Sequence, residues 1–146
     1  MELKDIVSVY LEAFPAHRRR PTEDLRRMIN DGTYKTYTNS DAFGLVLELE
    51  GFSLLNYFAV RSGMRKTGVG SELYRTIVKN HDPILMEVRR GLQFYFKHGA
   101  RLIRWYHKPP HYTDTAPYSM MLVYHGSKPL PSNYIEAIRR VYSGLV

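Results

Sequence analysis

The sequence contains no cysteine, and it has no long apolar run. The first absence excludes disulfides, thiol nucleophiles and cysteine zinc sites. The second argues against a membrane span, which needs roughly 18 consecutive apolar residues, and the charged start Met1–Asp5 lacks the apolar stretch of a secretory signal. We therefore expect a soluble cytoplasmic protein with no membrane partner.

Acidic residues are fewer than basic ones. The chain has 14 Asp and Glu against 21 Lys and Arg, which gives a formal net charge of +7 with histidine neutral. An excess of positive charge favours anionic partners, and nucleic acid, a membrane surface and a phosphorylated cofactor are all compatible with it. The aromatic content of 13% excludes a disordered basic tail, because such segments have few aromatic rings.

The hydrophobic pattern of the 146 residues predicts one domain with a mixed α/β or α+β sheet. Predicted strands cluster before residue 52, and strands alternate with helices after it. The predicted helices cover residues 3–14, 22–32, 69–80, 92–97 and 133–145. The predicted strands cover residues 34–38, 43–49, 52–60, 84–88, 102–107 and 118–124.

Two connecting segments and the last helix complete this outline. The run His17–Pro21 is typical of an exposed basic linker, and the proline-rich stretch 108–117 predicts a loop. The helix beyond residue 132 can pack either on its own sheet or on a second chain, so a homodimer stays open.

A glycine loop between a buried strand and a helix is the most informative segment. Residues Arg65–Ser71 follow the apolar strand that ends at Val60, and the helix begins at Val69. The first amides of a helix have no partner within it and carry the positive end of its dipole, so they favour a phosphate. Gly68 and Gly70 let a pyrophosphate approach the main chain without a Cβ in the way. A plain strand-to-helix turn is the alternative interpretation.

Two better-known phosphate loops do not match this segment. A P-loop needs a glycine directly before Lys-Ser or Lys-Thr, and the loop lacks that arrangement. The dinucleotide-binding fingerprint needs a third glycine where Leu73 stands. The segment therefore belongs to neither class.

Together with its surroundings, the loop resembles the coenzyme A motif of the GNAT superfamily of N-acetyltransferases. The motif is Arg or Gln, two residues, Gly, one residue, then Gly or Ala, and Arg65, Gly68 and Gly70 match it. The strand ending Phe58-Ala59-Val60 lies where the family has a strand ending Ala-Val. Three further segments extend the resemblance over roughly residues 3 to 124: Phe14-Pro15 with the following arginines, Phe94–Ala100, and the two strands within Leu102–Tyr124.

The resemblance implies a GNAT-like fold, in which helices flank a central, mostly antiparallel sheet with one splayed parallel strand pair. It also implies acetyl-CoA as the cosubstrate and direct attack of an amine on the thioester. The residues that it implies for cofactor binding are Ala59 and Val60, through the main chain, and Arg65, Lys66, Thr67, Gly68, Val69, Gly70 and Ser71 in the loop.

The resemblance also implies a general acid. Tyr95 matches the tyrosine that in many relatives gives a proton to the departing coenzyme A thiolate. A phenol with a pKa of about 10 suits that role. The alternative for Tyr95 is a packing residue whose hydroxyl is hydrogen-bonded.

The general base requires a separate argument. An alkylammonium must lose a proton before it attacks, and a carboxylate, directly or through water, is the usual acceptor. Many relatives carry Glu in the strand before the loop, where this chain has Asn56. We therefore predict that the base is Glu87, a lone carboxylate in the apolar strand 84–88. A salt bridge from Glu87 to Arg89 or Arg90 is the alternative.

The remaining candidates carry less information. His107 and His111 lie four residues apart, but Pro109 and Pro110 exclude the helix that would place both on one face, so we expect no metal site. The other arginine runs are typical of solvated faces.

Three functions remain open. The leading one is an N-acetyltransferase that acts on a primary amine of a small molecule, peptide or protein. The second is an acetyltransferase that acts on aminoacyl-tRNA, which the basic surface would attract. The third is a non-catalytic module that binds coenzyme A or nucleic acid. The sequence does not identify the acceptor.

Overall fold

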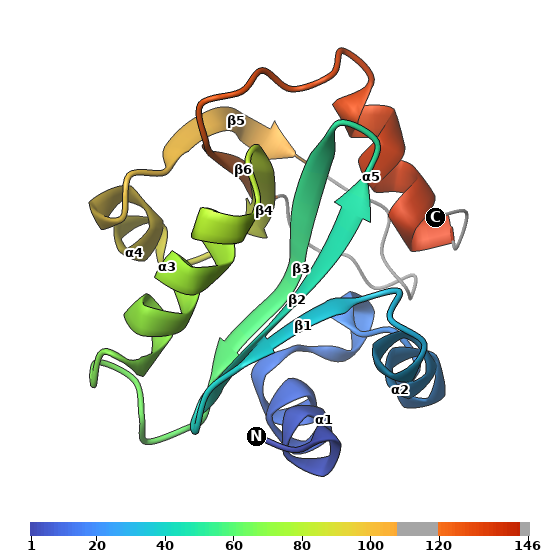
Figure 1. Cartoon of the computed structure of the whole chain (residues 1–146), viewed down its shortest axis with the longest axis vertical. Coiled ribbons are helices and arrows are strands. Elements are labelled where there is room, and N and C mark those ends of the chain that lie inside the picture. Colours follow the sequence, from blue (N-terminus) through green and yellow to red (C-terminus); the bar gives the residue numbers. More distant parts are fainter. Residues whose placement is uncertain (108–119, 144–146) are drawn as a thin grey trace.

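The computed structural model describes residues 1–107 and 120–143, which form a six-stranded sheet with helices on both faces (Figure 1). The strands follow the order β1-β2-β3-β4-β6-β5. Neighbouring strands are antiparallel except β3 and β4, which run parallel. The strand bounds are β1 Lys35–Thr38, β2 Ala42–Leu49, β3 Phe52–Val60, β4 Ile84–Val88, β5 Arg101–His107 and β6 Met120–His125.

The helices divide into two groups, one on each face of the sheet. Helices α1, α2 and α5 share one hydrophobic core with the sheet, and α3 and α4 pack against a second core on the opposite face. The helix bounds are α1 Leu3–Ala13, a 3₁₀ turn η1 Ala16–Arg18, α2 Thr22–Asn30, α3 Val69–Asn80, α4 Leu92–Lys97 and α5 Tyr134–Ser143. The predicted mixed class is therefore confirmed, and the predicted loop 108–117 lies outside the described residues.

The C-terminal helix α5 packs on its own sheet. Ile138 and Val141 are fully buried, and they lie in the same core as Leu85 of β4 and Leu122 of β6.

Of the helices within residues 1–107 and 120–143, none has both the length and the apolar character needed to cross a membrane.

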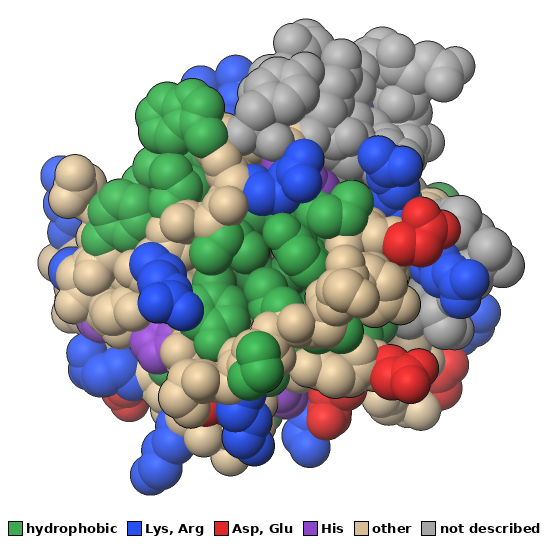
Figure 2. Space-filling model, turned by 90° about the horizontal axis from the view of Figure 1, so that it is seen from above, with side chains coloured by type: hydrophobic (Ala, Val, Ile, Leu, Met, Phe, Trp, Pro, Cys, Tyr) green, Lys and Arg blue, Asp and Glu red, His purple; other side chains and the backbone are tan. Residues whose placement is uncertain are grey.

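Basic side chains are spread over one face of the molecule. On the face seen from above, Lys and Arg side chains stand at separate places (Figure 2). Nucleic-acid-binding domains usually gather such residues on one face or along one helix. This face does not show that arrangement.

The parallel strands β3 and β4 separate after three residue pairs. Residues 53–55 of β3 pair with residues 84–86 of β4, and no paired residues follow between these two strands. β4 continues to pair with β6 as far as Val88, and β3 continues to pair with β2 as far as Val60. Beyond Leu55, the edge of β3 that faces β4 therefore lacks a strand partner within the described part of the chain.

A β-bulge lies where the two strands begin to separate. Leu45 of β2 pairs with Tyr57 of β3 and Val46 pairs with Leu55, which leaves Asn56 as an extra residue in β3. A bulge bends its strand and redirects its side chains. The bend accordingly coincides with the end of the pairing between β3 and β4.

The prediction that His17–Pro21 forms an exposed linker is wrong. Arg18 is 6% exposed and Arg20 is 8% exposed. Arg20 donates from Nε to the Tyr34 hydroxyl at 2.9 Å and from Nη2 to the Val141 carbonyl at 2.9 Å. Because buried oxygens replace water as hydrogen-bond partners, this basic segment is stable inside the protein.

Tyr57 links this buried segment to β3. Its hydroxyl donates to the Arg18 carbonyl at 2.7 Å and accepts a hydrogen bond from the Arg20 amide at 3.2 Å. The Tyr10 hydroxyl lies 3.4 Å from the same oxygen. One phenol therefore satisfies backbone groups that would otherwise be buried without partners.

We predict that Tyr57→Phe lowers the free energy of unfolding by about 1–3 kcal/mol, because it leaves a buried amide and a buried carbonyl unsatisfied. Urea denaturation measures the change. Tyr134→Phe is the matched control, since the Tyr134 hydroxyl has no hydrogen bond within the described residues and should change stability by less than about 0.5 kcal/mol. Equal effects of the two variants would contradict the prediction.

Candidate active site

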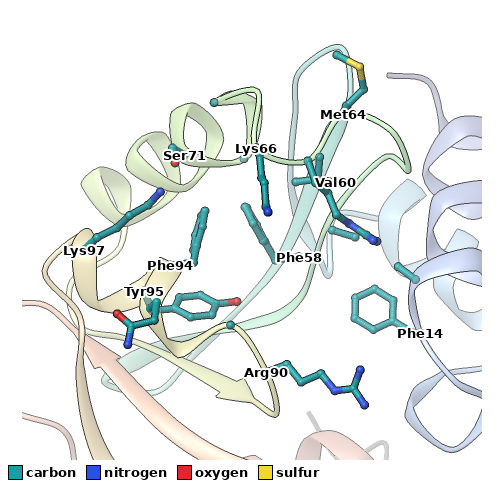
Figure 3. A pocket seen from close by; sticks show the side chains of 17 residues that line it. Phe14, Phe58, Val60, Met64, Lys66, Ser71, Arg90, Phe94, Tyr95 and Lys97 are labelled. Carbon is teal, nitrogen blue, oxygen red and sulfur yellow. The ribbon is translucent and has the colours of Figure 1, made fainter.

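A cavity of about 980 Å³ lies beside the C-terminal end of β3, between α3, α4 and the end of α1 (Figure 3). The aromatic side chains of Phe58, Phe94 and Tyr95 point into it. Lys66 and Lys97 also line the cavity. A large, mostly apolar cavity with a few basic groups is typical of a cofactor site.

The loop before α3 presents backbone amides to this cavity. Gly68, with a φ of 93°, is the N-cap of α3, and the first helical hydrogen bond runs from the Glu72 amide to the Gly68 carbonyl at 3.0 Å. The amides of residues 69–71 precede that bond, so they have no partner within the helix. Arg65 and Lys66 line the same end of the cavity. This end is suited to bind a phosphate group.

Seven of the nine predicted cofactor-binding residues line the cavity, and Thr67 and Val69 do not. The Thr67 hydroxyl donates to the Met64 carbonyl, and the Val69 carbonyl accepts a hydrogen bond from Asn39 Nδ2 at 3.0 Å. The seven are Ala59, Val60, Arg65, Lys66, Gly68, Gly70 and Ser71.

Gly70 allows α3 to pack closely on β3. A Cβ atom at this position would lie 2.9 Å from Val60 Cγ2 and 3.7 Å from a ring carbon of Phe94. A larger residue would therefore displace α3 as well as narrow the cavity. Gly68 is different, because a Cβ there would meet no atom within 4 Å. Glycine is favoured at this position because the backbone has a left-handed conformation.

A second cavity of about 400 Å³ adjoins the first. Phe14, Phe58, Arg90 and Tyr95 line both cavities. The second cavity lies where β3 and β4 diverge, since Asn56 of one strand and residues 86–88 of the other line it. The two cavities therefore meet at the point of separation.

Tyr95 lies at the junction of the two cavities. Its ring is packed edge to face against Tyr74, with centroids 5.6 Å apart. Burial raises the pKa of the Tyr95 hydroxyl to about 12. At neutral pH this hydroxyl is therefore protonated, and it has no hydrogen-bond partner within the described residues.

Glu87 of β4 is the centre of a buried polar network. Its side chain is 2% exposed, with Oε2 2.9 Å from His107 Nε2 and Oε1 accepting the Tyr142 hydroxyl at 2.7 Å. Arg18 Nη1 also lies 2.7 Å from the Tyr142 hydroxyl. Tyr142 thus joins the cation of Arg18 to the carboxylate of Glu87. Among the described residues Glu87 is paired with His107 by a hydrogen bond, and it forms no salt bridge with Arg89 or Arg90.

The pKa of Glu87 is lowered. Burial by itself would raise it, but the hydrogen bond from His107, the nearby positive charge of Arg18 and the hydrogen bond from Tyr142 outweigh burial. Glu87 is therefore ionised at neutral pH. An ionised carboxylate can only accept hydrogen bonds, so His107 Nε2 is the donor to Glu87 Oε2.

Sequence reasoning did not find the other members of this network. Arg18 lies in a basic run that is typical of exposed segments, and Tyr142 lies on a helix whose position relative to the sheet was open. His107 was considered only as a metal ligand. Within residues 1–107 and 120–143, no group of three or more His, Asp or Glu side chains is placed to hold a metal ion, and His111 lies outside the described residues.

The sequence matches no known family model and no curated protein, whereas solved structures share the fold. A GNAT-family acetyltransferase from Bacteroides thetaiotaomicron superposes with a TM-score of 0.78 at 23% identity, over 94% of this chain and 87% of that chain. The ribosomal-protein-S18-alanine N-acetyltransferase of Escherichia coli gives 0.65 at 15% identity, over 90% and 91%. An aminoglycoside 6'-N-acetyltransferase complexed with coenzyme A gives 0.63 at 12% identity, over 89% and 93%.

These similarities show the fold of the chain. It is the GNAT fold, with a mostly antiparallel sheet and one parallel pair that separates. The resemblance carried by the loop Arg65–Ser71 and the preceding strand therefore predicted the architecture correctly.

Proposed function

We propose that this chain is an acetyltransferase that moves an acetyl group from acetyl-CoA to a primary amine of a small molecule, a peptide or a protein. The observation that carries the proposal is that the cavity at the free amides of the α3 start adjoins a second cavity, which lies in the gap between β3 and β4. Acetyl-CoA supplies an acetyl group activated as a thioester, at the far end of the molecule from its pyrophosphate. A single site therefore needs an anion-binding end and a reactive end.

The anion-binding end is the α3 N-terminus. The amides of residues 69–71 donate to the pyrophosphate, and the positive end of the helix dipole favours its charge. Arg65 and Lys66, both exposed at this end of the cavity, add positive charge.

The free edge of β3 holds the arm that leads to the thioester. Ala59 and Val60 pair with β2 on one side, and on the side facing β4 they have no strand partner in the described structure. An extended ligand with amide groups can hydrogen-bond to such an edge as an added strand does.

Tyr95 and Glu87 are the proton donor and the proton acceptor of the reaction. The Tyr95 hydroxyl, kept protonated by its raised pKa, gives a proton to the departing thiolate. Glu87 accepts the proton of the attacking ammonium group through water, since it lines the second cavity and is ionised. The amine nitrogen then bonds to the acetyl carbon as the carbon–sulfur bond breaks.

We predict that Lys66→Glu weakens coenzyme A binding about tenfold or more, because a carboxylate repels the phosphates at this end of the cavity. Isothermal calorimetry measures the affinity. Arg75→Glu is the control, since it makes the same change in net charge on an exposed position of α3 that does not line the cavity. Identical affinities in the two variants would exclude the phosphate site.

We predict that Tyr95→Phe lowers turnover by about 10 to 100-fold with coenzyme A affinity nearly unchanged. The reason is that the phenyl ring keeps the packing and removes only the proton donor. Single-turnover rates of thiol release, with Tyr134→Phe as the control, measure the chemical step. A wild-type rate in that step would leave Tyr95 as a packing residue.

We predict that Glu87→Gln lowers the rate more at neutral pH than at high pH, where free amine is already abundant. The variant should also be less stable. Because the pKa of Glu87 is lowered in the folded protein, its carboxylate stabilises the fold above its ordinary value near 4.5, and this stabilisation is lost as the pH falls through the folded pKa. The difference in melting temperature between wild type and Glu87→Gln should therefore shrink on acidification.

The pH–rate profile and the melting temperature together test the role of Glu87. A destabilised variant with a wild-type pH–rate profile per folded molecule would show that Glu87 only stabilises the fold.

Coenzyme A at 100 times its dissociation constant should stabilise the protein by about 2.7 kcal/mol, so its binding can be measured by thermal denaturation without any acceptor.

A further inference from the structure

The second cavity has an unusual charge for the binding site of an amine. Arg18, Arg89 and Arg90 line it, and Glu87 is the one carboxylate among the described residues that do so. Both oxygens of Glu87 already accept hydrogen bonds. From Arg18, Arg90 and Glu87 alone, an acceptor in this cavity therefore meets more positive than negative charge from the described residues.

Arg18 adds a buried cation to this wall. Its side chain donates to the Tyr142 hydroxyl, and no carboxylate of the described residues lies within the 4.0 Å of an ion pair. Arg18 is 6% exposed. Glu87 offsets its charge through Tyr142 and not by direct contact. A buried guanidinium without a direct counter-ion favours an anion beside it.

Asn56 lines the cavity, and its side-chain amide keeps a hydrogen-bond donor. The Arg20 guanidinium can only donate, so the Tyr34 hydroxyl accepts from it and must use its own proton toward Asn56 Oδ1. This chain of bonds fixes the amide orientation, with Oδ1 occupied and Nδ2 free of partners within the described residues. Asn56 is 5% exposed and lines the second cavity, so Nδ2 is a buried donor available to a ligand there.

We propose that the acceptor is a small amine that carries an anionic group, a carboxylate or a phosphate, and that Asn56 Nδ2, Arg18 and Arg90 bind that group. This inference rests on the proposed acetyl transfer. A donor amide in place of a carboxylate at Asn56 cannot accept a proton from an ammonium group, but it binds an anion well. A cavity of about 400 Å³ has room for a molecule of amino-acid size.

Polycationic acceptors are disfavoured by the same charges. An amine-rich ligand such as an aminoglycoside would place further ammonium groups beside Arg18, Arg89 and Arg90. Like charges in a partly buried site cost several kcal/mol. The acceptor named for one structural relative, an aminoglycoside, therefore does not suit this chain.

Two matched pairs of amines test the proposal. Alanine is compared with alaninamide, and phosphoethanolamine with ethanolamine, with each rate corrected for the fraction of free amine. We expect the anionic member of at least one pair to have a kcat/KM about tenfold higher or more, and the pair with the larger preference identifies carboxylate or phosphate. If the neutral members react equally well or better, acetyl transfer stands and the anionic acceptor is excluded.

Asn56→Asp tests the assignment to this residue. An aspartate keeps an acceptor for the Tyr34 hydroxyl and replaces the donor by a negative oxygen, so the preference for the anionic amine should fall about tenfold or more. Asn80→Asp, an exposed change at the end of α3, is the control and should keep the preference. An unchanged preference in Asn56→Asp would overturn the role of Asn56.

A binding measurement separates this inference from the proposed function. If no amine is acetylated, the proposed function fails, and melting temperatures are then compared with coenzyme A saturating. A rise on adding alanine or phosphoethanolamine in wild type, and not in Asn56→Asp, would still support the anion site. The absence of any rise would exclude it.

Discussion

The separation of β3 from β4 after Leu55 and Met86 is the constraint on which the rest of the site depends. Sheets are continuous because unpaired backbone groups in the interior are costly, so a gap must be stabilised by other contacts. Here each strand keeps its outer partner, β2 or β6, while the inner edges are released. Within the described residues, the gap therefore leaves two strand edges without a strand partner.

Buried polar groups from distant parts of the chain hold the elements around this gap. Arg18 comes from the segment after α1, Glu87 from β4, His107 from β5 and Tyr142 from α5. Replacing any one of them would leave a buried charge or hydroxyl without its partner, which is more costly than a lost surface contact. The N-terminal segment and the C-terminal helix are thus linked to β4 beside the gap.

The two cavities differ in the chemistry that they offer. The larger has a mostly apolar interior with several aromatic rings, and backbone amides and exposed basic residues lie at its α3 end. The smaller has one buried arginine, Arg18, two exposed arginines and a buried asparagine amide. Tyr95 belongs to both, and burial keeps it protonated. A transfer between two bound molecules needs such a meeting point, because the reacting atoms must be held close together.

The sequence by itself determined the local part of this protein. The loop Arg65–Ser71 follows from a strand, two glycines and a helix start that are adjacent in the chain, so its amides and its place in the fold could be predicted. Glu87 could be singled out as a lone carboxylate in an apolar strand. Only the tertiary structure decided the partners of Glu87 and the burial of Arg18, because they depend on residues 20 to 124 positions apart in sequence. A run of basic residues looks the same in sequence whether its side chains hydrogen-bond to water or to a buried hydroxyl group. Only the packing of α5 on the sheet, which places Tyr142 beside Arg18, shows that this arginine is buried.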